Sequence, residues 1–225
     1  MKKLCIILLF AFCVVACTTR PGSVTAFLSN THLLEKGKNF QREYHNPKKS
    51  LEGYETIAIL PVDTSFLKDM SWWEKANIKN YDDSGIYPGA KADKNRTPAK
   101  SLSKYYSYYL RDSFKKDGSS LRYITYDGAD EKTLVLRIAL TELVPVKKFL
   151  LGFSLIGDGS LKGGTVAMEA KIENKSGDLL VMLTDREVNN MFKAERDNKQ
   201  VNYIAHAKPV VKEWIIGFQS LLKKK

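Results

Sequence analysis

The sequence predicts an α+β fold, in which two main helices pack on one face of a mostly antiparallel sheet. Residues 97–116 and 209–225 space their apolar side chains by three and four positions, as amphipathic helices do. Residues 133–145 and 166–173 alternate apolar and polar side chains, as strands with one buried face do. The predicted order is strand, helix, strand, strand, long loop, hairpin and helix. For that order, the most economical packing places both helices on the same face of the sheet.

The first predicted strand and helix have clear boundaries in the sequence. Residues 54–63 carry an apolar run that Pro61 and Asp63 end, so a buried strand is expected there. Thr97 is a suitable N-cap for the helix, and Pro98 is favoured at its first position. The expected core stripe of this helix consists of Leu102, Tyr105, Tyr106, Tyr109, Leu110 and Phe114. A tyrosine cluster of this kind favours packing on the sheet, with a carbohydrate or partner surface as the alternative.

Four further elements follow. A short strand is expected over residues 121–127, and a longer one over 133–145. A hairpin joins 166–173 to 179–185 through a tight turn. Its inward residues are expected to be Val166, Met168, Ala170 and Ile172, and its solvated ones Glu169, Lys171 and Glu173. The last helix begins near Pro209, with an apolar stripe of Val210, Val211, Trp214, Ile215, Phe218, Leu221 and Leu222.

The first 16 residues have the pattern of an export signal. Lys2 and Lys3 precede an uncharged apolar stretch from Leu4 to Ala16, too short to span a bilayer comfortably. The end of this stretch, Val14-Val15-Ala16-Cys17, resembles the lipobox of bacterial lipoproteins. The resemblance implies cleavage between Ala16 and Cys17 and lipidation of Cys17. The alternative is an ordinary secreted protein whose apolar stretch happens to end in Ala-Cys.

The cysteines and the charge fit this interpretation. All three cysteines lie within the first 17 residues, which argues against a disulfide scaffold or a structural zinc domain in the rest of the chain. We therefore expect a signal peptide at 1–16, a lipidated N-terminal segment at 17–53 and one α+β domain at 54–225. The formal net charge of +11 falls by two when Lys2 and Lys3 leave with the signal. Thr18, rather than Asp, favours the periplasmic face of the outer membrane under the sorting logic that the lipobox resemblance brings.

The body of the chain is similar to a family of bacterial lipoproteins that carry a domain of unknown function. The motifs that carry this resemblance are "FLS", "Y-NP", "L--Y----I-PV", "G---ME--I----G--L----D" and a closing helix with Trp. They are matched here by Phe27, Leu28, Ser29, Tyr44, Asn46, Pro47, Leu51, Tyr54, Ile59, Pro61, Val62, Gly164, Met168, Glu169, Ile172, Gly177, Asp178, Leu180, Asp185 and Trp214. Asn30-Thr31 and Asn174 depart from the pattern. The resemblance implies a compact α+β domain in the cell envelope and no established activity.

The sequence indicates no catalytic centre, cofactor or metal site. None of His32, His45 and His206 lies at zinc-ligand spacing from another His or Cys, and His206 is expected to be a surface or capping residue. A glycosidase needs two carboxylates facing each other across a cleft, which Glu169 and Glu173 on one strand face do not provide. We therefore predict a non-catalytic binding or scaffolding module of the envelope. The alternative is a cell-wall-directed hydrolase or another envelope enzyme.

The apolar segment 146–156 is a candidate interaction surface. It carries Phe149, Leu150, Leu151 and Phe153, more apolar side chains than a loop in solvent requires. A connection that covers the core is the alternative. The expected partners are the membrane, reached through the lipid on Cys17, and an envelope protein or acidic polymer. We expect no nucleic acid, because the compartment argues against it and the basic residues are scattered.

Overall fold

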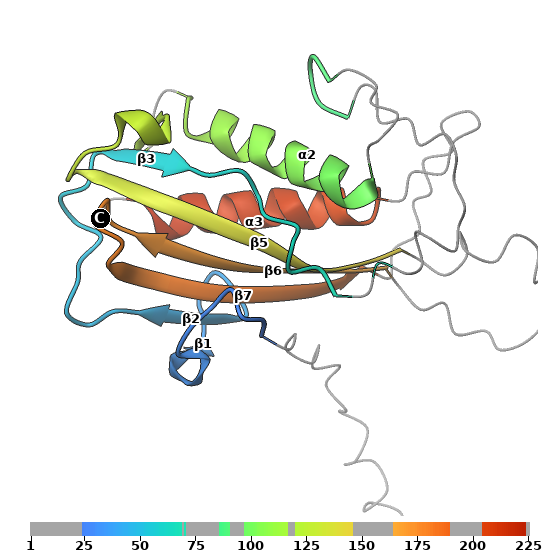
Figure 1. The fold of residues 1–225 in the computed structure, drawn as a ribbon, viewed down its shortest axis with the longest axis horizontal. Coiled ribbons are helices and arrows are strands. Elements are labelled where there is room, and N and C mark those ends of the chain that lie inside the picture. Colours follow the sequence, from blue (N-terminus) through green and yellow to red (C-terminus); the bar gives the residue numbers. More distant parts are fainter. Residues whose placement is uncertain are drawn as a thin grey trace, which may run out of the picture.

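The structure confirms the α+β class. It is a computed structural model that describes residues 24–68, 70, 86–90, 97–116, 120–145, 164–189 and 204–223. Seven strands form one sheet in the order β1-β2-β7-β6-β5-β3-β4, and the two helices lie together on one side of it (Figure 1). The strands are β1 (Glu35–Lys36), β2 (Arg42–His45), β3 (Thr56–Ile59), β4 (Arg122–Ile124), β5 (Thr133–Val144), β6 (Gly164–Glu173) and β7 (Leu179–Asn189). The helices are α2 (Pro98–Ser113) and α3 (Ala207–Leu221), with short 3₁₀ turns η2 (Thr31–Leu33) and η3 (Tyr126–Gly128).

Most neighbouring strands in the sheet are antiparallel. β5, β6, β7, β2 and β1 form a continuous antiparallel series, whereas β3 runs parallel to both of its neighbours, β4 and β5. Two parallel neighbouring strands need a crossover connection, and α2 supplies it between β3 and β4. The predicted hairpin is present as β6 and β7, with Gly177 at φ 86° in its turn.

The two helices begin and pack as the sequence predicts. Thr97 caps α2, because its side-chain oxygen accepts the N–H of Lys100 at 3.3 Å and Pro98 occupies the first turn. α3 begins at Ala207, two residues before Pro209. Together with the alternating apolar residues of β5 and β6, the buried stripes of both helices form one core. Its largest fully buried side chains include Tyr106, Phe218, Leu102, Leu136, Ile138 and Met168.

The opposite face of the sheet has a cover that the sequence analysis does not predict. Residues 24–34 lie against this face, where Leu28 and Leu34 pack on Met182 of β7. The prediction that Glu169 is solvated is wrong, because its side chain is only 1% exposed. Its two carboxylate oxygens accept the backbone N–H of Thr25 at 2.6 Å and the Thr25 hydroxyl at 2.7 Å. The N-terminal segment is therefore fixed to the centre of β6.

Helix α3 offers a matched test of the core. Phe218 is fully buried, whereas Ile216 is 61% exposed on the same helix. Phe218→Ala should lower the free energy of unfolding by about 3–5 kcal/mol, because it removes apolar contacts and leaves a cavity. Ile216→Ala should change it by less than about 0.5–1 kcal/mol. Urea unfolding of both variants measures the difference, and equal losses would contradict this packing of α3.

Candidate functional site

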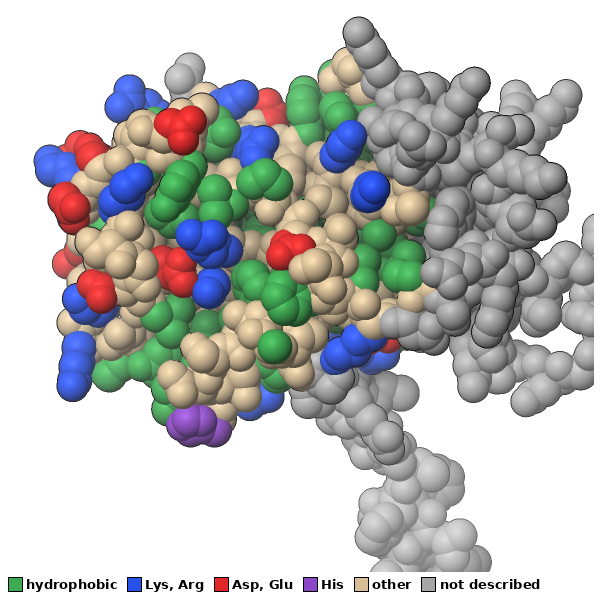
Figure 2. Space-filling view, in the orientation of Figure 1, with side chains coloured by type: hydrophobic (Ala, Val, Ile, Leu, Met, Phe, Trp, Pro, Cys, Tyr) green, Lys and Arg blue, Asp and Glu red, His purple; other side chains and the backbone are tan. Residues whose placement is uncertain are grey.

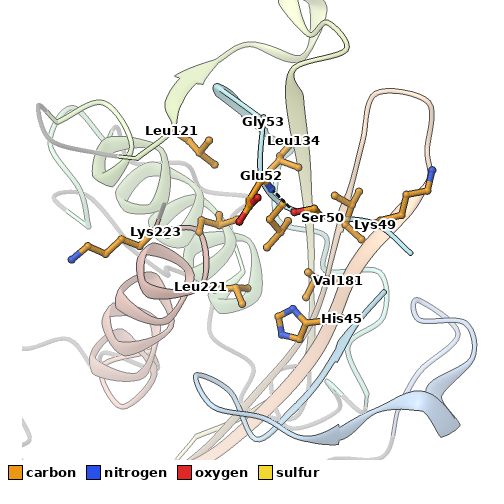
Figure 3. Close-up of a pocket in the computed structure, with 13 residues that line it drawn as sticks. His45, Lys49, Ser50, Glu52, Gly53, Leu121, Leu134, Val181, Leu221 and Lys223 are labelled. Atoms are coloured by element: carbon orange, nitrogen blue, oxygen red, sulfur yellow. Dashed lines mark hydrogen bonds between the residues drawn. The ribbon is translucent and has the colours of Figure 1, made fainter. Parts of the chain in front are cut away.

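A cavity of about 530 Å³ lies at one end of the sheet, beside the C-terminal end of α3 (Figure 3). The end of β2, the beginnings of β5 and β7, and the loop between β2 and β3 complete its wall. Its aliphatic lining consists of Leu51, Leu121, Leu134, Leu180, Val181, Leu221 and Leu222. Its remaining lining residues are His45, Lys49, Ser50, Glu52, Gly53 and Lys223. A concave site of this size, with an apolar back and polar groups at its mouth, is typical of small-molecule binding.

The apolar wall is built from residues that also belong to the core. Leu134, Leu180 and Val181 are at most 1% exposed, so they form the back of the cavity. Leu134 and Val181 come from strands on either side of β6, and α3 adds Leu221 at its last position. The cavity therefore opens at the end of the packed layer between the helices and the sheet.

The mouth of the cavity is polar and exposed. Lys49, Glu52 and Lys223 are all exposed, and in Figure 3 Glu52 lies between the two lysine side chains. The Ser50 hydroxyl oxygen accepts the backbone N–H of Glu52 at 3.0 Å. His45 Nε2 lies 3.1 Å from a carboxylate oxygen of Glu43. The Ser and His side chains thus each contact a neighbour in their own segment, an arrangement that supports local structure.

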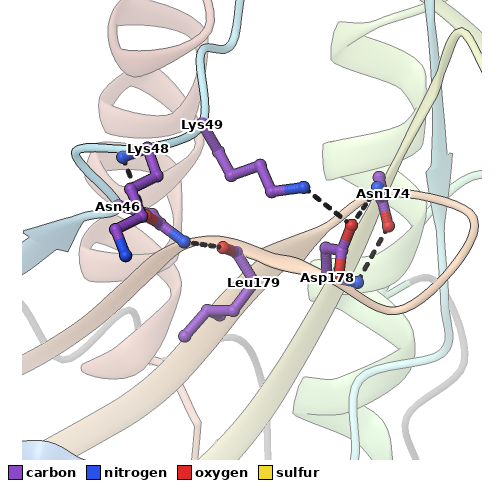
Figure 4. A network of polar contacts seen from close by, with 6 residues as sticks. All are labelled: Asn46, Lys48, Lys49, Asn174, Asp178 and Leu179. Atoms are coloured by element: carbon purple, nitrogen blue, oxygen red, sulfur yellow. Dashed lines mark hydrogen bonds and ion pairs between the residues drawn. The ribbon is translucent and has the colours of Figure 1, made fainter.

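One wall of the cavity is held by the network in Figure 4. The Asn46 side chain donates to the carbonyl of Leu179 at 2.9 Å and accepts the N–H of Lys48 at 3.0 Å, and the Asn46 N–H donates to the carbonyl of Leu180 at 2.8 Å. Lys49 Nζ lies 3.0 Å from Asp178 in the β6–β7 turn. Hydrogen bonds from Lys49 and Asn174 lower the pKa of Asp178 below its usual value. The β2–β3 loop is therefore tied to the start of β7.

A second group of polar atoms lies inside the core, at Asp185. Burial, and then repulsion from Glu187, raise the pKa of the Asp185 carboxyl to about 7. Tyr106 and Trp214 pack beside this site with ring centroids 5.8 Å apart, and the Tyr106 hydroxyl donates to Met168 Sδ at 3.2 Å. Burial and the nearby Asp185 raise the pKa of Tyr106 well above its usual value. Asp185 is therefore poised to gain or lose a proton near neutral pH.

Comparison with known proteins identifies the family. The model of the family described as "Protein of unknown function (DUF3313)" matches residues 24–216. The chain belongs to this family. No curated protein and no solved structure matches it.

Seven of the residues that carry the sequence resemblance to the lipoprotein family lie in two places in this DUF3313 member. Leu51 and Leu180 line the cavity, and Asn46 and Asp178 fix its wall. The second place is the buried cluster of Met168, Asp185 and Trp214. Motifs far apart in the sequence thus meet at the cavity or at the buried carboxyl.

Several predicted site residues lie outside the described part of the DUF3313 domain. Ala16 and Cys17, the predicted cleavage and lipidation residues, are among them. So are the residues of the predicted interaction surface, Phe149, Leu150, Leu151 and Phe153. Both assignments stay predictions. Within the described ranges, no helix has the length and apolar character needed to cross a membrane, and no three metal-ligating side chains come together.

The structure decides two other predictions. The tyrosine cluster packs mainly on the core: Tyr105 and Tyr106 are buried, and Tyr108 stacks on Tyr87 with ring centroids 5.0 Å apart.

His206 precedes α3 at the capping position, but the expectation of a surface side chain is wrong, because its ring is buried against Gly164. Burial lowers the pKa of His206 to about 4 despite a hydrogen bond with the backbone of Thr165. Only glycine fits at position 164, since any Cβ there would overlap this ring.

The hydrogen bonds of Asn46 and the ion pair of Lys49 predict which polar contacts stabilise the cavity wall. Asn46→Ala removes the side-chain hydrogen bond that joins the loop to β7 and a second one within the loop, so the free energy of unfolding should fall by about 1–2 kcal/mol. Lys49→Ala removes only an exposed ion pair and should cause a smaller loss. Urea unfolding of both variants checks this order. A larger loss for Lys49→Ala would show that the ion pair, rather than the amide, holds the loop.

Asp185 predicts a pH dependence of stability. Its pKa rises from about 4 in the unfolded chain to about 7 in the fold, so ionisation weakens the folded state progressively over that range. The stability of Asp185→Asn relative to the natural protein should therefore rise between about pH 4 and pH 7 and level off above it. Each pKa unit is worth about 1.4 kcal/mol, which makes the full effect a few kcal/mol.

The control for this measurement is Asp178→Asn. Asp178 has a lowered pKa in the fold, so its ionised form stabilises the structure. The relative stability of this variant should fall as the pH rises through about 4, the opposite sign to Asp185→Asn. Guanidinium unfolding at several pH values gives both difference curves. A flat curve for Asp185→Asn would contradict a buried carboxyl with a raised pKa.

Proposed function

We propose that this DUF3313 protein is a lipid-anchored, non-catalytic binding module of the bacterial cell envelope. It is held through Cys17 at the periplasmic face of the outer membrane. The observation that carries the binding role is the cavity, whose wall is aliphatic and whose mouth residues Ser50 and His45 contact their own segments. Such a site provides affinity and shape rather than a reacting group.

The attachment of the N-terminal segment supports the anchor. Eight positions separate Cys17 from Thr25, and Thr25 is bonded directly to Glu169 in the sheet. A fully extended chain of that length spans at most about 28 Å. A lipid on Cys17 would therefore hold the domain close to the membrane surface.

The charge distribution supports envelope partners rather than nucleic acid. Figure 2 shows basic and acidic side chains interspersed over the visible face of the described residues. Nucleic-acid binding favours basic residues gathered on one face or stripe. Binding to a membrane surface, an envelope protein or an acidic polymer does not require such a stripe. The net positive charge of the protein is enough to attract each of these partners weakly.

The alternative of a cell-wall-directed hydrolase requires a different site. Glycoside hydrolysis usually takes two carboxylates on opposite sides of the bond that is cleaved. Among the described residues that line the cavity, Glu52 is the one carboxylate, so the lining does not supply such a pair. The buried Asp185 lies in the core cluster with Tyr106 and Met168, so the two carboxylates do not face each other across this cavity.

Metabolic labelling tests the anchor. The full chain, expressed in bacteria fed radiolabelled palmitate, should incorporate label, and Cys17→Ala should lose it. Cys5→Ala and Cys13→Ala are matched controls that should keep the label, because both residues lie within the predicted signal peptide. Normal labelling of Cys17→Ala would rule out the proposed attachment point.

A further inference from the structure

The chemistry of the cavity wall indicates what kind of ligand it accepts. All seven apolar lining residues are Leu or Val, and the lining contains no Phe, Tyr or Trp. Sugars and nucleobases are usually held by stacking on aromatic rings, which this wall does not offer. A flexible aliphatic chain makes its contacts with methyl and methylene groups, and branched aliphatic side chains match it well. The wall therefore favours an acyl chain.

The mouth of the cavity carries charges of both signs. Lys49 and Lys223 extend to opposite sides in the view of Figure 3, with Glu52 between them. A purely anionic headgroup would be repelled by Glu52, and a purely cationic one would be repelled by the lysines. Lys49 already pairs with Asp178, so a headgroup with a phosphate and an ammonium is matched by Lys223 and Glu52, the phosphate by the lysine and the ammonium by the carboxylate.

We infer that the cavity binds one acyl chain of a phospholipid whose zwitterionic headgroup carries a phosphate and an ammonium. The chain lies against Leu134, Leu180 and Val181, and the headgroup stays at the mouth, near Glu52 and Lys223. This inference rests on the proposed binding role of the same cavity. It adds the chemical class of the ligand, which that role alone leaves open.

The size and burial of the site agree with a single chain. A volume of about 530 Å³ falls within the range of small-molecule sites. The back of the cavity is almost fully shielded, with Leu134 at 0% and Leu180 at 1% exposed. Each methylene group that leaves water for such a wall favours binding, so the tail supplies affinity and the headgroup supplies selectivity.

Photo-crosslinking in cells tests the inference on the full chain. Bacteria that express the protein are fed a palmitate analogue bearing a diazirine and an alkyne, which enters their phospholipids, and are then irradiated. The purified protein is digested, and mass spectrometry locates each adduct and gives the mass of its lipid. We expect adducts on peptides that contain cavity residues such as Leu51, Leu121 or Leu221, with the mass of a zwitterionic phospholipid.

Two variants make the test specific. Ser50→Trp places a large side chain at the exposed mouth and should reduce cavity adducts about tenfold, because the chain loses the burial of several methylene groups. Ser220→Trp, on the exposed side of α3 and outside the lining, should leave them unchanged. Glu52→Lys makes the mouth wholly basic and should shift the recovered lipid from zwitterionic to anionic. Circular dichroism confirms that each variant folds.

The outcomes separate this inference from the proposed anchor. An analogue that enters the anchor itself is found on the peptide that contains Cys17, whereas cavity adducts lie elsewhere in the chain. Adducts confined to the Cys17 peptide would overturn the inference while supporting the anchor. Cavity adducts that persist unchanged in Ser50→Trp, or that carry mainly anionic lipid in the natural protein, would also overturn it.

Discussion

The fold depends on covering both faces of its three long central strands. β5 and β6 bury most of their residues, including those that point away from the helices, and β7 buries residues 180–185. Helices α2 and α3 cover one face, and residues 24–34 cover part of the other. Because a sheet with two apolar faces cannot leave either in water, the N-terminal segment 24–34 is part of the fold rather than a simple linker.

Glu169 makes the second cover specific. A carboxylate buried in the middle of a sheet is very unfavourable unless hydrogen bonds replace its lost hydration. The backbone N–H and hydroxyl of Thr25 supply two short bonds, at 2.6 and 2.7 Å, one to each oxygen. Apolar packing of Leu28 and Leu34 on Met182 would tolerate small shifts along the sheet, whereas these paired bonds fix one position. The bonds between Thr25 and Glu169, within this otherwise apolar cover, therefore fix where the N-terminal segment leaves the sheet.

Local periodicity predicts the parts of the fold that local burial decides. The alternation in 166–173 and the stripe from Val210 to Leu222 are visible in the sequence, because each element turns one regular face to the core. The same alternation predicts that Glu169 faces solvent. Its side chain is instead buried by the N-terminal segment, through a contact with Thr25, which lies 144 positions away in the sequence. β2 is short and polar, and its pairing with β7 joins Arg42 to Thr184. The cavity likewise depends on contacts between distant parts of the sequence, since Leu51 and Leu222 both line it. Periodicity within one segment carries no information about such contacts.

The contact between Thr25 and Glu169 lies near the back of the cavity along the sheet. Val181 in the cavity wall pairs with Ile172, which lies three residues along β6 from Glu169, a distance of about 10 Å. The chain from Thr25 to Cys17 can extend to about 28 Å, well beyond that separation. A lipid on Cys17 would thus keep the domain that contains the cavity close to a bilayer. The proposed tether would raise the local concentration of membrane lipid around the domain, so that a site of modest intrinsic affinity would still be occupied.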